Sequence, residues 1–165
     1  MTLDSDRFRE LVGTFATGCT VVTITGDTHH GLTANAFTSV SLSPPLVLVC
    51  VDHDTKSYEL LEQDDVDGFT INILSKAQQD LGDHFADITH VDEDPFETRT
   101  VDGLDTHAPV FEAVLAYLDC SLSASHREGD HTVYVGHVEA GDDLNPDAPP
   151  LAFYQGEWGT VETDQ

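Results

Sequence analysis

Basic residues are scarce in this sequence of 165 residues: 6 Lys and Arg side chains face 31 Asp and Glu, for a formal net charge of −25. A surface of this sign disfavours nucleic acids and anionic membranes as partners. In dilute buffer it would also repel itself and weaken the compact state, whereas molar salt shortens the screening length to about 3 Å. Because the acidic residues are spread along the chain, we interpret them as adaptation to a very salty cytoplasm, in preference to an ordinary acidic surface.

Cysteine and long apolar runs are also rare. The three cysteines, Cys19, Cys50 and Cys120, form no Cys-x-x-Cys pair, and their odd number inside apolar runs predicts free buried thiols in a reducing compartment. No apolar run approaches the roughly 18 residues typical of a membrane-spanning helix, and the N-terminus lacks the features of a signal peptide. We therefore expect a soluble, cytoplasmic protein.

Several common motifs are missing. There is no Gly-x-Gly-x-x-Gly after a strand and no P-loop, which argues against these two kinds of nucleotide binding. Gly-x-Ser-x-Gly and His-Glu-x-x-His are absent too, so neither an α/β-hydrolase nor a zincin is indicated. We read the nine histidines as structural or surface groups and predict no metal site. The adjacent His29 and His30 lie in an expected turn, where both rings cannot easily face one ion.

Enough apolar residues are present for a folded core. Leu, Ile, Val and Phe number 44 of 165, about 27%, above the roughly 20% below which highly charged chains stay unfolded. The length fits a single domain over residues 1–165.

The patterning predicts many short strands and few helices. Strands are expected at 19–25, 30–41, 46–51, 69–74, 114–125, 132–140, 151–154 and 158–161, and helices at 5–17, 56–63 and 78–85. The first helix would be capped by Asp4 or Ser5 and end at Gly18, and the strand at 46–51 would be buried on both faces. Such a chain is expected to be mainly β, an antiparallel barrel that is closed or partly closed.

Residues 31–41 are the most informative stretch. Thr33, Asn35, Thr38, Ser39 and Ser41 place hydroxyl and amide groups in a segment that otherwise patterns as a strand. Little side-chain bulk and available backbone N–H groups would suit a flat polar ring lying close to the chain. An edge strand with a solvated face explains the same composition equally well, so composition alone leaves both readings open.

An ordered set of motifs resembles the flavin reductase-like family, the small reductase components of two-component flavin monooxygenases. The motifs are residues 14–23 (TFATGCTVVT), 31–35 (GLTAN), 39–46 (SVSLSPPL), 78–86 (QQDLGDHFA), 129–131 (GDH) and 150–154 (PLAFY). The resemblance covers nearly the whole chain and implies a Greek-key FMN-binding split β-barrel. It further implies an NAD(P)H:flavin oxidoreductase that uses FMN or FAD with NADH or NADPH, forms a homodimer and supplies reduced flavin to a monooxygenase.

The resemblance also implies a role for each matching residue. Thr33, Ala34 and Asn35 would line the isoalloxazine ring, with Ser39, Val40 and Ser41 beside it through main chain and hydroxyls. Cys50, Val51 and Asp52 would follow the ribityl chain, Lys56 and Ser57 would take the phosphate, and Phe85 and Ala86 would close the far side. His131, as the catalytic-site candidate, would lie near the nicotinamide with Tyr154 and Gly156, and His126 is a weaker candidate.

Two features qualify this assignment. Lys56 is one of only two lysines, and a local cation matters more where the surrounding field repels anions, which favours a phosphate-binding role over an ordinary surface lysine. Ala36 replaces a serine common in the family, so one flavin hydrogen bond would be missing. The alternatives are a flavin carrier or electron-transfer protein on the same fold, and an oxidase with tightly held FMN.

Overall fold

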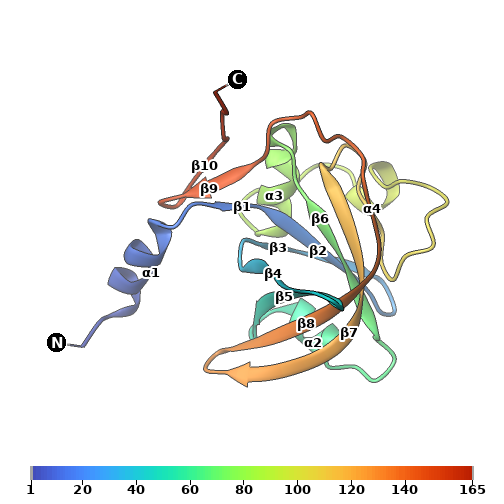
Figure 1. The fold of residues 1–165 in the computed structure, drawn as a ribbon, viewed down its shortest axis with the longest axis horizontal. Helices are drawn as coiled ribbons and strands as arrows, with labels where there is room; N and C mark the ends of the chain where they lie inside the picture. The colour runs from blue at the N-terminus through green and yellow to red at the C-terminus, as the bar shows by residue number, and fades with distance from the viewer. Residues whose placement is uncertain (1, 165) are drawn as a thin grey trace.

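The computed structural model describes residues 2–164 (Figure 1). In chain order its elements are α1 (Ser5–Gly13), β1 (Thr17–Gly18), β2 (Thr20–Thr25), β3 (His29–Ala34), β4 (Phe37–Leu42), β5 (Pro45–Asp52), α2 (Lys56–Leu61), β6 (Gly68–Ile73), the 3-10 turn η1 (Lys76–Gln78), α3 (Gln79–Phe85), α4 (Pro95–Thr98), β7 (Ala116–Glu128), β8 (His131–Asp143), β9 (Ala152–Tyr154) and β10 (Glu157–Gly159). Within these residues, no helix is long and apolar enough to cross a bilayer.

The strands form two antiparallel sheets. Seven strands follow the order β3-β2-β6-β7-β8-β5-β4, and three short strands follow the order β1-β9-β10. The larger sheet curls so that β3 lies against β5, and the Cys50 N–H donates to the Ala36 carbonyl at 3.1 Å. The prediction of a mainly β, antiparallel split-barrel fold with a few short helices is confirmed.

Two apolar clusters form the core. The first fills the curl of the large sheet and includes Val22, Val49, Phe69, Ile71 and Tyr134. The second lies beneath α3 and is built from the fully or almost fully buried side chains of Cys19, Val21, Leu74, Leu81, Val110, Phe111, Val114, Tyr117 and Leu151. Strand β2 contributes to both clusters, with Val22 and Ile24 in the first and Val21 in the second, so it is packed on both faces.

Two strand predictions are wrong in instructive ways. Strand β5 is not buried on both faces: Val47, Val49 and Val51 point into the core, whereas Leu48 and Cys50 are only partly covered. The segment 30–41 is not one strand, because β3 ends at Ala34 and β4 begins at Phe37. The chain has to pass at this break from one edge of the large sheet to the other.

Helix α1 begins as predicted and ends earlier than predicted. The Asp4 carboxylate accepts the Arg7 backbone N–H at 2.8 Å, an N-cap, but the last helical residue is Gly13 rather than a residue just before Gly18. None of its residues is buried, and its apolar side chains Phe8, Leu11, Val12 and, just beyond the helix, Phe15 are exposed. Figure 1 shows α1 standing apart from the large sheet, so the rest of residues 2–164 leaves most of this apolar face uncovered.

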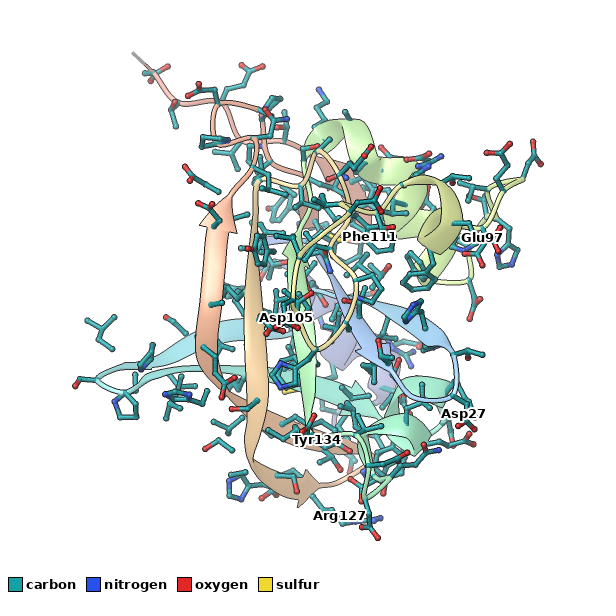
Figure 2. All side chains as sticks on the ribbon, turned by 90° about the vertical axis from the view of Figure 1, so that its right-hand side faces the viewer. Asp27, Glu97, Asp105, Phe111, Arg127 and Tyr134 are labelled. Atoms are coloured by element: carbon teal, nitrogen blue, oxygen red, sulfur yellow. The ribbon has the colours of Figure 1, made fainter. Side chains whose placement is uncertain are left out.

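A long irregular segment between α3 and β7 is fastened to the sheet by buried polar groups. Asp119 on β7 accepts the Thr70 hydroxyl and the His107 backbone N–H, both at 2.9 Å, and its other oxygen lies 2.9 Å from His107 Nδ1. The Asn72 side chain accepts the Phe111 N–H at 2.8 Å. Figure 2 shows this segment, which carries Asp105 and Phe111, crossing in front of the strands.

Candidate functional site

Two cavities lie at the two ends of strand β3. The α3 cavity, about 520 Å³, is bounded by the first residues of β3, the loop into α2, the end of α3 and residues 87–96. The α1 cavity, about 870 Å³, lies between α1, the start of β2, residues 35–38 and the outer face of β5. Its walls are mostly apolar, with Phe37, Leu48, Ile73 and Phe153 among them.

Some of the residues predicted to bind flavin border one of the two cavities, whereas the others, such as Ser39, Val51 and Ser57, border neither. Along β3, Leu32 borders the α3 cavity and Asn35 the α1 cavity. Where β5 ends, Cys50 borders the α1 cavity and Lys56, a few residues later, borders the α3 cavity. On the predicted assignment, the ring would lie at the α1 cavity and the phosphate at the α3 cavity, along what we call the flavin path.

Of the residues predicted to line the isoalloxazine ring, those in and just after β3 offer a ligand mainly their backbone groups. The Thr33 hydroxyl donates to the Gly82 carbonyl of α3 at 2.6 Å, so it is already engaged, and Ala34 is buried at 8% exposure. Asn35 is exposed at the end of the strand and borders the α1 cavity. Of these three side chains, Asn35 is therefore the one free to reach a ligand in that cavity.

Strand β4 offers an irregular edge. Ser39 and Val40 are exposed and Ser41 is half-buried. The register with β5 shifts between Ser39 and Ser41, which leaves Val40 as a bulge on an edge strand. A bulge of this kind leaves backbone donors and acceptors unpaired, which suits the predicted main-chain contacts to a ring.

The three residues predicted to follow the ribityl chain, Cys50, Val51 and Asp52, lie at the end of β5 and differ in which groups could contact a ligand. The Val51 side chain is buried in the core at 1% exposure, so only its backbone could face a ligand. Cys50 points the other way, and burial raises the pKa of its thiol, which keeps it protonated at neutral pH. Asp52 accepts the Asp54 N–H at 2.8 Å and thereby shapes the loop that leads to Lys56.

The start of α2 carries the donors expected for a phosphate. The Lys56 side chain is 57% exposed, and its Nζ lies 3.2 Å from Glu59 Oε2. Thr55 caps the helix by accepting the Tyr58 N–H at 3.2 Å. Since α2 spans six residues, its dipole adds little, and the cation is the main attraction for an anion.

Two buried hydroxyls lack a hydrogen-bond partner among residues 2–164, and both lie beside this path. They are Ser57 Oγ, next to Lys56, and Thr17 Oγ1, in the wall of the α1 cavity. Buried polar atoms are normally paired, so an unpaired one calls for a ligand or a small movement. The cation, the unpaired Ser57 hydroxyl and the neighbouring cavity together fit a phosphate group.

Phe85 and Ala86 end α3 on the far side of the α3 cavity. The Phe85 ring covers Gly31, where an added Cβ would lie 2.6 Å from the ring, so β3 and α3 approach closely only because residue 31 is a glycine. Phe85 also packs on Phe96 and Phe111, with ring centroids 5.5 Å apart in each pair. Ala86 caps the helix and is exposed.

The residues assigned to the nicotinamide do not form one cluster within the chain. His131 pairs across the sheet with Asp52, and its Nδ1 lies 2.7 Å from Asp130 Oδ1, a bond that lowers the pKa of the Asp130 carboxyl. Gly156, at φ +79°, borders the α1 cavity. The exposed Tyr154 lies on β9, and Figure 1 shows β9 far from the start of β8.

Several lining residues escaped the sequence interpretation. His84, His90 and Phe96 border the α3 cavity, and Thr17 borders the α1 cavity. His84 lies beside Phe85 within a recognised motif, so its neighbourhood could have been inferred. His90 and Phe96 come from an irregular segment whose path no periodicity predicts.

Comparison with known proteins agrees with this geometry. The family model described as "Flavin reductase like domain" matches residues 12–162. An NADH-dependent flavin reductase of a Rhodococcus species is 40% identical over 160 residues, 94% of this chain and 86% of that protein. The reductase subunit of a flavin-dependent monooxygenase of Mycobacterium tuberculosis is 32% identical over 167 residues, 99% of this chain and 86% of that protein.

A solved structure of a flavin reductase has a similar fold. The NADH:FAD oxidoreductase of Streptomyces globisporus, in complex with NAD and FAD fragments, matches with a TM-score of 0.86 at 34% identity, over 99% of this chain and 98% of that one. The chain therefore belongs to the flavin reductase-like family.

Proposed function

We propose that this protein is an NAD(P)H:flavin oxidoreductase that transfers hydride from a reduced nicotinamide to FMN, or to FAD, and supplies the reduced flavin to a monooxygenase. The observation that carries the proposal is the path along β3 and β5, with Lys56 in the cavity at one end and apolar walls in the cavity at the other. The relatives that are NADH-dependent flavin reductases and monooxygenase reductase subunits support both parts.

The chain's own residues would orient and shield the reactants. Lys56 and the Ser57 hydroxyl would hold the flavin phosphate, and the unpaired backbone beside Val40 would bond the edge of the ring. The apolar walls of the α1 cavity, such as Leu48 and Phe153, would exclude water. When bound, the nicotinamide and the flavin supply the hydride chemistry themselves, so the protein needs no general acid.

The exposed apolar residues and the net charge support proposals for the oligomeric state and the cellular environment. The exposed apolar side chains of α1, together with Leu42 at 94% exposure, support a homodimer in which a second copy covers the α1 face and the adjoining cavity. The net charge of −25 supports a cytoplasmic protein of high internal salt, acting as one unit over residues 1–165. The same charge favours NADH over NADPH, whose additional phosphate it would repel.

The test is oxidation of NADH and NADPH by the pure protein in multimolar KCl, with and without added FMN or FAD. Oxidation that rises and saturates with added flavin is the expected result, because the flavin then acts as an exchangeable substrate. Flavin binding without oxidation would replace the proposal with a carrier or electron-transfer protein. Absence of flavin binding would contradict both.

His131→Ala is expected to raise the KM for the nicotinamide about three- to tenfold, with a smaller effect on flavin affinity. The reason is that its half-exposed ring lies opposite Asp52, beside the ribityl part of the flavin path, where it could contact a nicotinamide cofactor bound along the flavin. Steady-state kinetics and flavin titration measure the two effects separately. His137→Ala, which removes a half-buried histidine further along the same strand, at a position that borders neither cavity, is the control. Weaker flavin binding with an unchanged nicotinamide KM would show that His131 serves the flavin.

A further inference from the structure

The outer wall of the α3 cavity is a segment without regular structure. Six of its residues, Asp87, His90, Val91, Asp92, Glu93 and Asp94, border the cavity. The segment leaves α3 through Asp87, which has φ +57°, and the Ile88 N–H is held by the Asp83 carbonyl at 3.0 Å. We call residues 87–94 the cavity wall.

One side chain of α3 fastens the middle of the cavity wall. The Val91 backbone N–H donates to His84 Nδ1 at 3.2 Å. A backbone N–H can only donate, so His84 Nδ1 must carry no proton, and the ring is neutral in this arrangement. The His84 ring also packs edge-on against Phe85 and His90, with centroid distances of 4.7 and 5.4 Å.

The surroundings of His84 favour this neutral ring. Burial is the main cause that lowers its pKa, and His90 adds to the effect, while Asp94 and Asp87 oppose it. Arg99 acts weakly in the same direction as His90, and its charge is partly balanced by Asp80, whose Oδ2 lies 2.7 Å from Nη1.

The other charged groups that border the cavity are Asp54, Lys56, His29, His30, Asp92 and Glu93. Among these groups, His30 is a second histidine that can change its protonation state with pH. Burial lowers its pKa, Asp87 opposes this effect, and Lys56 adds to it. A pH dependence of flavin binding at this cavity could therefore come from either histidine. Only a variant of His84 can assign the dependence to that residue.

We propose that His84 is a positioning residue for flavin: its neutral ring holds the cavity wall in place through Val91, and protonation of the ring releases the wall and weakens flavin binding. The link to flavin rests on the proposed function, because Lys56, the expected phosphate ligand, borders the same cavity. The attachment of the wall to His84 does not depend on that function.

The direction of the pH dependence follows from the lowered pKa. A free histidine takes up its proton at about pH 6.5, whereas His84 in the fastened state takes it up at a lower pH. The fastened wall is therefore fully stable above about pH 6.5 and loses stability as the pH falls from there through the pKa of the fastened state. Each unit by which the pKa is lowered corresponds to about a tenfold change in the equilibrium.

The experiment compares the wild-type protein with His84→Asn in multimolar KCl between pH 8 and pH 5. Asparagine offers an amide oxygen close to the position of Nδ1 and does not titrate, so it keeps the acceptor and removes the pH dependence. Hydrogen exchange gives the protection factor of the Val91 amide, and quenching of FMN fluorescence gives the Kd. His30 and the FMN phosphate titrate in both proteins, so they cancel in the comparison.

In the wild-type protein, the protection factor of Val91 and the affinity for FMN are expected to fall together as the pH drops below about 6.5, relative to His84→Asn. Protection of Val91 that does not depend on pH in the wild-type protein would overturn the proposal even if the variant failed to fold. Loss of protection with unchanged FMN affinity would overturn the link between the wall and the flavin. Failure to bind FMN at any pH would contradict the proposed function, whereas the exchange data would still test the attachment of the wall.

Discussion

Replacing Lys56 by methionine is expected to raise the Kd and the KM for FMN by about 10- to 100-fold and to leave kcat at saturating flavin largely unchanged. The charge-assisted bond of a lysine to a phosphate contributes about 1.5–3 kcal/mol, which corresponds to this range. Lys56 is well placed to make such a bond, because it is half-exposed at the edge of the α3 cavity and beside the unpaired Ser57 hydroxyl. Fluorescence titration and steady-state kinetics in molar KCl measure both constants.

The chain supplies its own control for this experiment, because its second lysine is Lys76. Lys76 is exposed on η1 and borders neither cavity, so Lys76→Met makes the same change in charge and length elsewhere. An equal loss of flavin affinity in both variants would mean that net charge matters and that Lys56 has no local role. Lys56→Arg should recover part of the affinity, since the positive charge remains although the geometry differs.

The motifs predicted the family and most of the elements, but they did not predict which surfaces face each other. The strand at 46–51 has an unbroken apolar sequence, yet one face of β5 is buried in the core and the other borders a cavity. Periodicity cannot separate these cases, because an apolar cavity wall and a core face use the same residue types. The break at Asn35 and Ala36 escaped notice for a related reason: it reflects a passage between the two edges of the sheet, which is a property of topology rather than of local propensity.

In the candidate site too, some residues could be predicted from the sequence and others only from the fold. The prediction of Lys56 as a phosphate ligand rests on the rarity of lysine in this chain and on the family resemblance, and it stays a prediction. His84 was missed, although it lies between residues that were noticed, because its role depends on the path of an irregular segment back to the Val91 amide. Ser57 was expected to bind phosphate, but that its hydroxyl is buried without a partner could be learned only from the fold.

Asp119→Ala is expected to destabilise the protein by about 3–5 kcal/mol, the usual cost of breaking a buried charged network. Asp119 is 4% exposed, and its loss would leave two N–H groups of His107 without their acceptor and leave the Thr70 hydroxyl with the Ala108 carbonyl alone. For a chain of this length, each kcal/mol lowers Tm by about 2–4 °C, so a drop of roughly 6–20 °C should be seen by calorimetry in molar KCl.

A control variant separates the effect of losing the Asp119 hydrogen bonds from the effect of losing one negative charge. Glu139→Ala removes the same charge from an exposed position on the neighbouring strand β8, and in molar KCl it should leave Tm nearly unchanged, because the surface repulsion is screened. Asp119→Asn should fall between the two, since an amide oxygen can still accept some of these bonds. A Tm for Asp119→Ala equal to that of Glu139→Ala would show that Asp119 does not hold the irregular segment to the sheet. The expected large loss would instead mean that the segment between α3 and β7, which includes the wall of the α3 cavity, depends on Asp119 as its anchor on the sheet.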